Sequence, residues 1–223
     1  MSHLSVTVLM GGPDSERDVS IASGKAVTAA LEQSGKFDVT SICIELPTDR
    51  EIARIDADVV FPVLHGPFGE GGPLQTMLEN AGITFVGSNS KVSRNAMDKV
   101  KTKQIASTCD IPTPPWCVMT ADESCTIPPP LVLKPIDDGS SVDIALCFDD
   151  AQVENARVKL HQNRSTLLAE SYVGGREITV SIIDGTPLSI IEIIPQGELR
   201  TYDFAAKYER EDTQFVIDPN LPS

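Results

Sequence analysis

The chain has 223 residues, of which 41% are hydrophobic and 22% charged, and its formal net charge is −14 at pH 7. This length and composition are typical of a globular protein with one large or two smaller domains. The acidic balance argues against a general binder of nucleic acid or anionic membranes, because those partners reward a basic surface. The sequence contains no basic, apolar leader and no long apolar span. It therefore predicts a soluble cytoplasmic protein that is not attached to a membrane.

The N-terminal region predicts a parallel α/β sheet. An apolar, β-branched run over 4–10 is typical of a buried strand, and apolar residues at helical spacing follow it until Gly35. Ser15 and Asp18 have the spacing of a capping box at the start of this helix. Further strands are predicted at 39–44, 58–64 and 83–86, and they alternate with helices at 51–55 and 73–81.

Two glycine-rich loops, at 10–20 and 65–72, follow the first and third of these strands. In a parallel sheet, ligands bind beyond the carboxyl ends of the strands, so both loops are candidate site loops. A strand, a glycine turn and a helix N-terminus favour an anion. The full charges of Glu16–Asp18 are unusual in a phosphate loop, however, and Glu16 indicates that this site also holds a cation.

From residue 88 onward the pattern changes. We predict helices at 88–97, 98–109 and 151–162, and an extended, proline-stiffened crossing over 111–116. Strands are predicted at 131–134, 142–148 and 166–172, with a loop at 135–141. The segments 178–183 and 188–193 read as a hairpin around Asp184-Gly185. Residues 216–223 have the pattern that leads into a helix.

The five cysteines lack the spacing of a metal site or a redox motif, since there is no C-x-x-C pair and no histidine spaced as a co-ligand. Most lie in or beside apolar runs, and we therefore interpret them as buried free thiols in a reducing compartment. They are Cys43, Cys109, Cys117, Cys125 and Cys147.

Taken one by one, the candidate site residues have ordinary structural explanations. Lys134 at a strand end is typical of a surface lysine, 139–141 of a hairpin turn, and His65 of a packed histidine. Solvated surface acids are the ordinary explanation for Glu70, Glu170 and Glu177. A basic and aromatic pair such as Lys207-Tyr208 often only packs over a sheet.

Together and in order, six stretches carry a resemblance. They are Gly11–Ser20, His65–Gln75, Met97–Lys99, Lys134–Val142, Gly174–Val180 and Tyr202–Tyr208. Along essentially its whole length the chain resembles the D-alanine–D-alanine ligases of the ATP-grasp superfamily. The resemblance implies an α/β fold in which an N-terminal parallel-sheet, Rossmann-like (pre-ATP-grasp) domain at 1–96 precedes an incomplete ATP-grasp fold. The latter would comprise a central subdomain at 97–176 and an incomplete C-terminal subdomain at 177–223.

The resemblance also implies a two-step ligation for peptidoglycan precursor synthesis. ATP phosphorylates the carboxylate of one D-alanine, and the amine of a second D-alanine attacks the acyl phosphate. Glu16 would hold the ammonium of the substrate and would be linked to Ser140 and Tyr208, the other two residues of the catalytic group. His65 would lie near the first substrate and Glu70 would support its loop. Family members are commonly homodimers through the N-terminal domain.

On the nucleotide side, the resemblance implies that three lysines and two loop hydroxyls neutralise and hold the ATP phosphates. These are Lys99, Lys134, Lys207, Ser140 and Ser141. The adenine–ribose slot would be lined by Glu170, Tyr172, Val173 and Glu177. Tyr208, in place of Phe, favours an amine over a hydroxy acid as the second substrate.

The chain departs from the family pattern at Gly71, Asp143 and Ser171, where an acid, a glycine and a lysine are usual. The family's later segment, which supplies an arginine and the ligands for Mg²⁺, does not follow Ser223. We therefore expect a C-terminally truncated ligase that uses ATP and, for the family, Mg²⁺, with no metal ligand in this chain and impaired phosphoryl transfer.

Two alternatives stay open. The first is a ligase remnant that binds ATP or D-alanine without turnover. The second is a different ATP-grasp carboxylate–amine ligase, against which Glu16, His65 and Tyr208 speak together.

Overall fold

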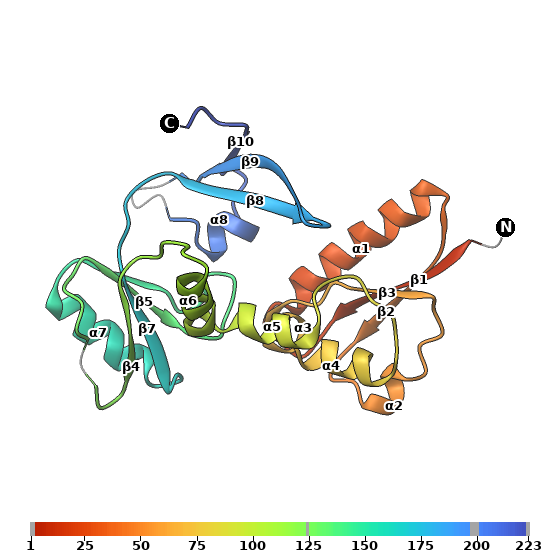
Figure 1. The fold of residues 1–223 in the computed structure, drawn as a ribbon, viewed down its shortest axis with the longest axis horizontal. Helices are drawn as coiled ribbons and strands as arrows, with labels where there is room; N and C mark the ends of the chain where they lie inside the picture. The colour runs from red at the N-terminus through yellow and green to blue at the C-terminus, as the bar shows by residue number, and fades with distance from the viewer. Residues whose placement is uncertain (1–2, 124, 197–200, 222–223) are drawn as a thin grey trace. The chain divides into compact units, whose positions relative to one another are not determined.

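The structure is a computed structural model that describes residues 3–123, 125–196 and 201–221. The chain divides into two compact units (Figure 1). The N-terminal unit comprises Met1–Thr113 with Ile136–Gly139, and the C-terminal unit comprises Pro114–Pro135 with Ser140–Ser223. In the described part of the chain, no helix is both long and apolar enough to span a membrane.

The N-terminal unit is built on a parallel sheet, as predicted. Its strands β1 (Leu4–Gly11), β2 (Phe37–Ile44) and β3 (Val59–Pro62) are ordered β2-β1-β3. The predicted strand at 83–86 is reduced to one bridge between Val60 and Phe85. Gly82 and Gly87, both at positive φ, bound this segment, so the chain is extended there for only four residues.

Helices cover both faces of this sheet. The long helix α1 (Arg17–Ser34) lies on one face, and α2 (Asp49–Ile52) and α4 (Pro73–Asn80) lie on the other (Figure 1). The core between the sheet and α2 and α4 contains Leu9, Ile52, Val60, Leu64, Leu74 and Leu78. Three further helices, α3 (Gly66–Glu70), α5 (Ser90–Met97) and α6 (Lys99–Thr108), complete the unit.

Helix boundaries differ from the predicted ones at two places. The predicted end of α1 at Gly35 is confirmed, because Gly35 adopts the left-handed conformation at the C-cap. The predicted capping box is wrong, since the N-cap is Glu16 and no side chain caps the helix. The loop predicted at 65–72 contains the short helix α3, which begins with Gly66-Pro67 because proline suits a first helical turn.

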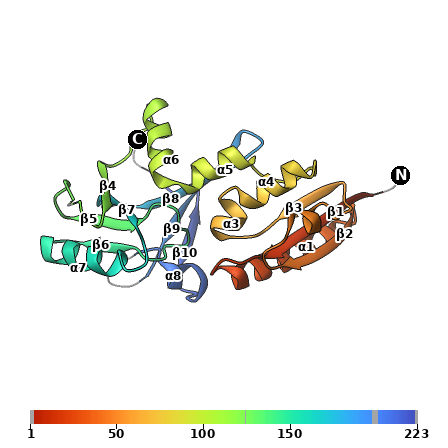
Figure 2. The same cartoon turned by 90° about the horizontal axis from the view of Figure 1, so that it is seen from below.

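The C-terminal unit contains a four-stranded antiparallel sheet of order β4-β7-β5-β6. Its strands are β4 (Trp116–Thr120), β5 (Leu131–Pro135), β6 (Ala145–Cys147) and β7 (Thr166–Ser171), and α7 (Asp150–Leu160) runs beside β6 (Figure 2). Strand β4 continues the predicted extended crossing and was not foreseen as a strand. Strand β6 is shorter than predicted because Ser140, Ser141 and Asp143 have positive φ.

A second antiparallel sheet, of order β10-β9-β8, follows. The predicted hairpin is confirmed as β8 (Glu177–Ile183) and β9 (Thr186–Ile194), with a turn at Asp184-Gly185. The segment predicted to lead into a helix contains instead the end of β10 (Gln214–Ile217), whose backbone pairs with β9. A short helix, α8 (Phe204–Tyr208), precedes it.

The interpretation of the cysteines as buried thiols is only partly right. All five are free, but Cys43 and Cys109 are exposed, and only Cys147 is fully buried. Cys43 lies on the edge strand β2, and Cys109 is the C-cap of α6. Cys117 and Cys125 are half-buried.

Candidate functional site

In the N-terminal unit, side chains of the opening motif tie the two glycine-rich loops to the sheet. The Asp14 carboxylate accepts a hydrogen bond from the Phe68 amide at 2.8 Å. Ser20 Oγ accepts from the Gly11 amide at 2.9 Å and donates to the Val63 carbonyl at 2.7 Å. The loops after β1 and β3 are therefore held together at the carboxyl edge of the sheet.

Arg17 also acts on the backbone. Its Nη1 donates to the Ile44 carbonyl at 2.6 Å and to the Gly12 carbonyl at 3.0 Å. The opening motif carries three consecutive charged residues, Glu16, Arg17 and Asp18. Of these, Arg17 joins the glycine turn after β1 to the end of β2. The sequence left Arg17, Asp14 and Ser20 without a role, and the long-range contacts that explain them carry no local signal.

Glu16 is the acidic residue that the sequence singled out in this loop, and it is only 4% exposed. It is the N-cap residue of α1, where the partial positive charge of the helix favours a carboxylate. A Cβ placed on Gly139 would lie 3.5 Å from Glu16 Oε2, so the carboxylate lies beside the loop at 136–139. The structure therefore brings Glu16 and this part of the predicted phosphate loop together.

His65 and Glu70 line one cavity of about 300 Å³ in the same unit. His65 Nδ1 lies 3.9 Å from Glu70 Oε1, and Glu70 Oε2 accepts a hydrogen bond from the Gly66 amide. Gln75 also lines the cavity and donates through Nε2 to the Gly69 carbonyl at 2.7 Å. Within the described residues, His65 Nε2 and Gln75 Oε1 are buried and have no hydrogen-bond partner, so their hydrogen-bonding capacity is unused.

Lys99 begins α6 and is held against the loop at 136–139. Its amide donates to the Ile136 carbonyl at 2.8 Å, and its Nζ donates to the Asp138 carbonyl at 2.5 Å. The structure therefore places this predicted phosphate ligand beside the loop that the sequence assigned to phosphate.

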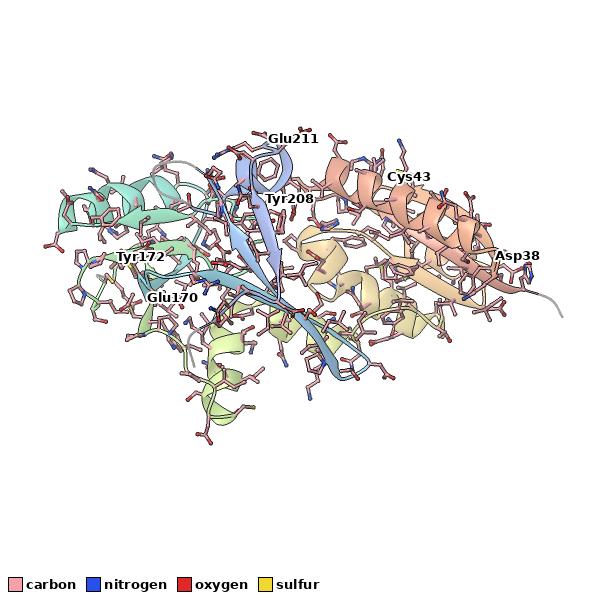
Figure 3. All side chains as sticks on the ribbon, turned by 90° about the horizontal axis from the view of Figure 1, so that it is seen from above. Asp38, Cys43, Glu170, Tyr172, Tyr208 and Glu211 are labelled. Carbon is pink, nitrogen blue, oxygen red and sulfur yellow. The ribbon has the colours of Figure 1, made fainter. Side chains whose placement is uncertain are left out.

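In the C-terminal unit, Lys134 and Glu170 form an ion pair of 2.5 Å between Nζ and Oε2. They lie on the neighbouring strands β5 and β7, and their side chains are 21% and 13% exposed. Glu170 and Tyr172 lie at the end of β7 (Figure 3). The rings of Tyr172 and Phe148 are in edge contact, with their centroids 6.3 Å apart. Val173, which follows, is largely exposed.

The loop after β5 is anchored to α8 and to the segment before it. Ser140 Oγ and Tyr208 Oη lie 2.9 Å apart, and Ser141 Oγ donates to the Tyr202 carbonyl at 3.0 Å. Ser140 and Ser141 both have positive φ, so the loop holds a backbone conformation that is uncommon for residues other than glycine. Residues distant in sequence thereby fix the two hydroxyls.

The departures from the family pattern have local explanations at two of the three positions. Asp143 adopts the positive φ that glycine prefers, and Arg164 Nη2 pairs with its carboxylate at 2.9 Å, which offsets the negative charge. At Gly71 an added Cβ would lie 2.3 Å from the Pro67 carbonyl oxygen, so this turn leaves no room for an acid. Ser171, at the end of β7, has no explanation beyond its backbone bond to Pro115.

Lys207 and Glu177 lie close enough to influence one another. Partial desolvation raises the pKa of the Glu177 carboxyl, and the positive charge of Lys207 opposes that shift. Lys207 Nζ also lies 5.2 Å above the centroid of the Tyr202 ring, a cation–π contact that holds the ammonium. Tyr202 belongs to a motif that the sequence identified but was assigned no role.

The C-terminal unit holds two clusters of candidate side chains, one on β5 and β7 and one around α8. Lys134 and Lys207 supply positive charge, Ser140 and Ser141 supply hydroxyls, and Glu170 and Glu177 supply acceptors. The residues that the structure describes contain no group of three or more His, Cys, Asp or Glu side chains arranged to hold a metal ion.

Comparisons with known proteins point in one direction. Residues 105–223 match the family model described as the C-terminus of D-ala D-ala ligase, and residues 45–88 match the model of its N-terminus. A D-alanine–D-alanine ligase of Syntrophotalea carbinolica is 36% identical over 225 residues, which cover all of this chain and 73% of that protein. A ligase of Methylacidiphilum infernorum is 38% identical, and the match covers 92% of this chain and 66% of the relative.

A solved structure of similar shape is the D-alanine–D-alanine ligase of Bacillus anthracis, at a TM-score of 0.83 and 33% identity. The match covers 98% of this chain and 73% of that one. The same enzyme complexed with ATP matches at a TM-score of 0.79 and 32% identity, over all of this chain and 73% of the other. These likenesses confirm the expected fold.

Proposed function

The chain belongs to the D-alanine–D-alanine ligase family, and from that premise we propose that it joins two D-alanine molecules at the expense of ATP. In the proposed reaction, the D-alanine carboxylate takes the γ-phosphoryl group of ATP, which releases ADP and leaves an acyl phosphate. The amine of a second D-alanine then attacks the acyl carbon and expels inorganic phosphate.

One observation carries this proposal furthest, the 2.9 Å contact between Ser140 Oγ and Tyr208 Oη. The two residues are 68 positions apart, and they are the same two that the family resemblance links to Glu16. A contact between two hydroxyls at this distance orders the loop at 135–141, which is the loop that we expect to bind the phosphates.

For the first half-reaction, we propose that Lys99, Lys134 and Lys207 neutralise the phosphates while Ser140 and Ser141 bind their oxygens. Positive charge that is already in place stabilises the transferring phosphoryl group without reorganisation. The adenine and ribose would lie against Glu170, Tyr172 and Val173, with Glu177 accepting hydrogen bonds from the ribose hydroxyls. The raised pKa of Glu177 indicates a partly desolvated carboxyl, which suits a contact with neutral hydroxyls.

For the amino-acid end, we propose that Glu16 holds the D-alanine ammonium. Its burial favours this role because a buried carboxylate interacts strongly with a cation. His65 and Glu70 would line the first D-alanine subsite, and the unpartnered His65 Nε2 can meet a polar group of the substrate.

Several wider statements belong to the same proposal. The reaction would serve peptidoglycan precursor synthesis in the cytoplasm, and the N-terminal domain would form a homodimer. The domain division at 1–96, 97–176 and 177–223 follows the family. Mg²⁺ accompanies ATP in the family resemblance.

The test is phosphate release from ATP by the purified chain with Mg²⁺ and D-alanine, together with nucleotide binding by calorimetry. Tyr208→Phe removes the hydroxyl from the Ser140 contact, and we expect turnover to fall roughly two- to twelvefold, as the loss of one hydrogen bond implies. Ser34→Ala, which removes a hydroxyl at the exposed end of α1, should leave turnover unchanged.

The alternative is a remnant that binds without joining. The chain spans 73% and 66% of the length of the two relatives described above. Saturable ATP binding with no phosphate release would establish the remnant and exclude the ligase for this chain. Release of phosphate with an amino acid other than D-alanine as the preferred substrate would point to another carboxylate–amine ligase.

A further inference from the structure

Two cysteines of the C-terminal unit are in direct contact. Cys117 lies in β4 and Cys125 lies in the loop after it, and their Sγ atoms are 3.6 Å apart. Both side chains are half-buried and pack against the core of the four-stranded sheet. The Cys125 thiol is held in place, because it donates to the Ile127 carbonyl at 3.3 Å and accepts from the Ile127 amide at 3.4 Å.

A small molecule can reach Cys125 from one side. Cys125 lines a surface pocket of about 360 Å³, whose walls also include Met119, Ile127, Val153 and Arg157. The pocket is far larger than a hydroperoxide needs. The contact between the two thiols therefore lies next to an entrance instead of deep in the core.

We propose that Cys117 and Cys125 form a thiol modification site, at which a hydroperoxide converts the contacting pair into an intramolecular disulfide. One thiolate attacks the outer oxygen of the peroxide, the O–O bond breaks, and a sulfenic acid forms as water or an alcohol leaves. The second thiol then displaces water from the sulfenic sulfur and forms the S–S bond. In sum, two thiols lose two electrons and two protons, and the peroxide is reduced to water and an alcohol, or to two waters when it is hydrogen peroxide.

Proximity is the physical reason for choosing this pair. Because the sulfur atoms already touch, the second step is intramolecular and competes well with further oxidation of the sulfenic acid. The exposed cysteines have other neighbours: Cys43 contacts Arg17, and Cys109 contacts Thr108. We therefore expect them to be oxidised to acids rather than to disulfides within the chain.

When Cys125 is the attacking thiol, the first step is slow at neutral pH because little of its thiolate is present. Burial, together with a smaller contribution from the contacting Cys117, raises the pKa of Cys125 to about 11. Since the thiolate is the nucleophile, the rate should rise about tenfold per pH unit below that value. This dependence distinguishes the pair from an exposed thiol, whose rate levels off at lower pH.

The cross-link would join β4 to the loop at 121–127, of which the structure describes all residues but 124. In β4, Cys117 is paired with Ala169 of β7, and Trp116 is paired with Glu170, a proposed ATP ligand. A disulfide here would therefore brace the edge of the sheet that carries the proposed adenine slot. It would close a short loop and so reduce the entropy of the unfolded chain.

The experiment treats the purified, folded chain with excess hydrogen peroxide and maps the products by proteolysis and mass spectrometry without reduction. We expect a linked pair of peptides containing Cys117 and Cys125 that is two hydrogens lighter than the separate peptides. We also expect a melting temperature a few degrees higher, which dithiothreitol reverses.

Three variants make the test decisive. Cys125→Ser and Cys117→Ser should each abolish the linked peptide and the thermal shift, and either one suffices if the other fails to fold. Cys43→Ser, which removes an exposed thiol of the other unit, should leave both intact. A link between Cys125 and Cys147, or oxidation of Cys117 and Cys125 only to separate acids, would overturn the proposal.

Discussion

At the residue scale, the side chains that fix the candidate site act mostly on backbone atoms. Asp14 and Ser20 join the loop after β1 to the loop after β3. Arg17 donates to the Gly12 carbonyl and so holds the glycine turn after β1. The family motif identified where these residues lie but not what they contact. Glu16 is the residue of this motif to which we assign a ligand, and its role can be separated from theirs.

We expect Glu16→Gln to weaken D-alanine binding about ten- to a hundredfold, the range for losing a hydrogen bond between charged groups, while ATP affinity stays nearly unchanged. The reason is that glutamine keeps the shape of the side chain and removes only its charge. Calorimetric titration with each ligand measures the two affinities. Glu32→Gln, an exposed position on α1, is the matched control. An equal loss of both affinities would make Glu16 structural.

At the scale of elements, α1 approaches the sheet through small residues. Its buried positions are Ser20 and Gly24, while the alanines at 22, 26 and 30 are exposed. The apolar spacing correctly predicted a helix. It could not reveal the contact face, because a close approach of helix and strand depends on the absence of a side chain, which a hydrophobic pattern does not record.

Gly24→Val should therefore destabilise the N-terminal unit. A Cβ at this position would lie 2.6 Å from Met10 Cβ in β1, so helix and strand would have to separate. Overpacking of this kind costs about 1–3 kcal/mol and lowers the melting temperature by about 2–10 °C in a chain of this size. Circular dichroism measures the shift, and Ala29→Val on the exposed face of α1 is the control. Equal melting temperatures of the two variants would contradict this packing.

A second element contact joins α4 to α5. Glu79 accepts hydrogen bonds from the Ser90 amide at 2.8 Å and from Ser90 Oγ at 2.6 Å. These bonds lower the pKa of the Glu79 carboxyl below 4.5. The ionised carboxylate thus stabilises the fold above the unfolded pKa, and this contribution is lost as the pH falls through the lowered folded pKa.

For Glu79→Gln we expect a lower melting temperature than wild type at pH 7 and a smaller difference as the pH falls through the lowered pKa of Glu79, because the wild-type carboxyl then becomes protonated. Thermal melts at a series of pH values measure this. Glu32→Gln, on an exposed face of α1, is the control with no such contact. A deficit that stays constant as the pH falls would show that the ionised form of Glu79 does not matter.

At the scale of the whole molecule, the order of motifs predicted the family and the fold class well. The N-terminal parallel sheet and the hairpin of β8 and β9 follow from local patterns. The pairing of Lys134 with Glu170 depends on the register of two strands. The pairing of Ser140 with Tyr208 joins residues that are 68 positions apart in the sequence. The resemblance placed Ser140 and Tyr208 in one group with Glu16, while Lys134 and Glu170 were foreseen only as two separate ATP contacts.

Segments whose conformation depends on tertiary pairing were the ones missed. β4 forms because β7 offers it a partner, and β10 forms because β9 does, whereas the sequence around each contains prolines that favour loops. The backbone of Ser140, Ser141 and Asp143 is left-handed, although serine gives no such signal and aspartate only a weak one. Arg164 and Tyr202 support this loop from a distance, which explains why they were not found.

Binding of ATP should stabilise the folded chain as a whole. At a nucleotide concentration about a hundred times the dissociation constant, mass action contributes about 2.7 kcal/mol. That corresponds to a rise in melting temperature of about 5–10 °C. Lys134→Met should reduce this rise, because Lys134 is a proposed phosphate ligand and pairs with Glu170. Differential scanning fluorimetry measures both chains.

The control for that comparison is Lys159→Met on the exposed side of α7, which should keep the full rise. If ATP shifted the melting temperature of the wild type and of Lys134→Met by the same amount, Lys134 would have no part in nucleotide binding.

The sheet of β8, β9 and β10 also governs how copies of this chain behave together in solution. Large apolar side chains are exposed on it, among them Ile182, Ile183, Phe215 and Ile217, and β8 and β10 are its edges. Such edges template intermolecular pairing. The net charge of −14 opposes it by repulsion that reaches about 8 Å at 0.15 M salt and less at higher salt. Colloidal stability therefore falls as salt is added, and dilute buffer is the condition in which the chain stays dispersed.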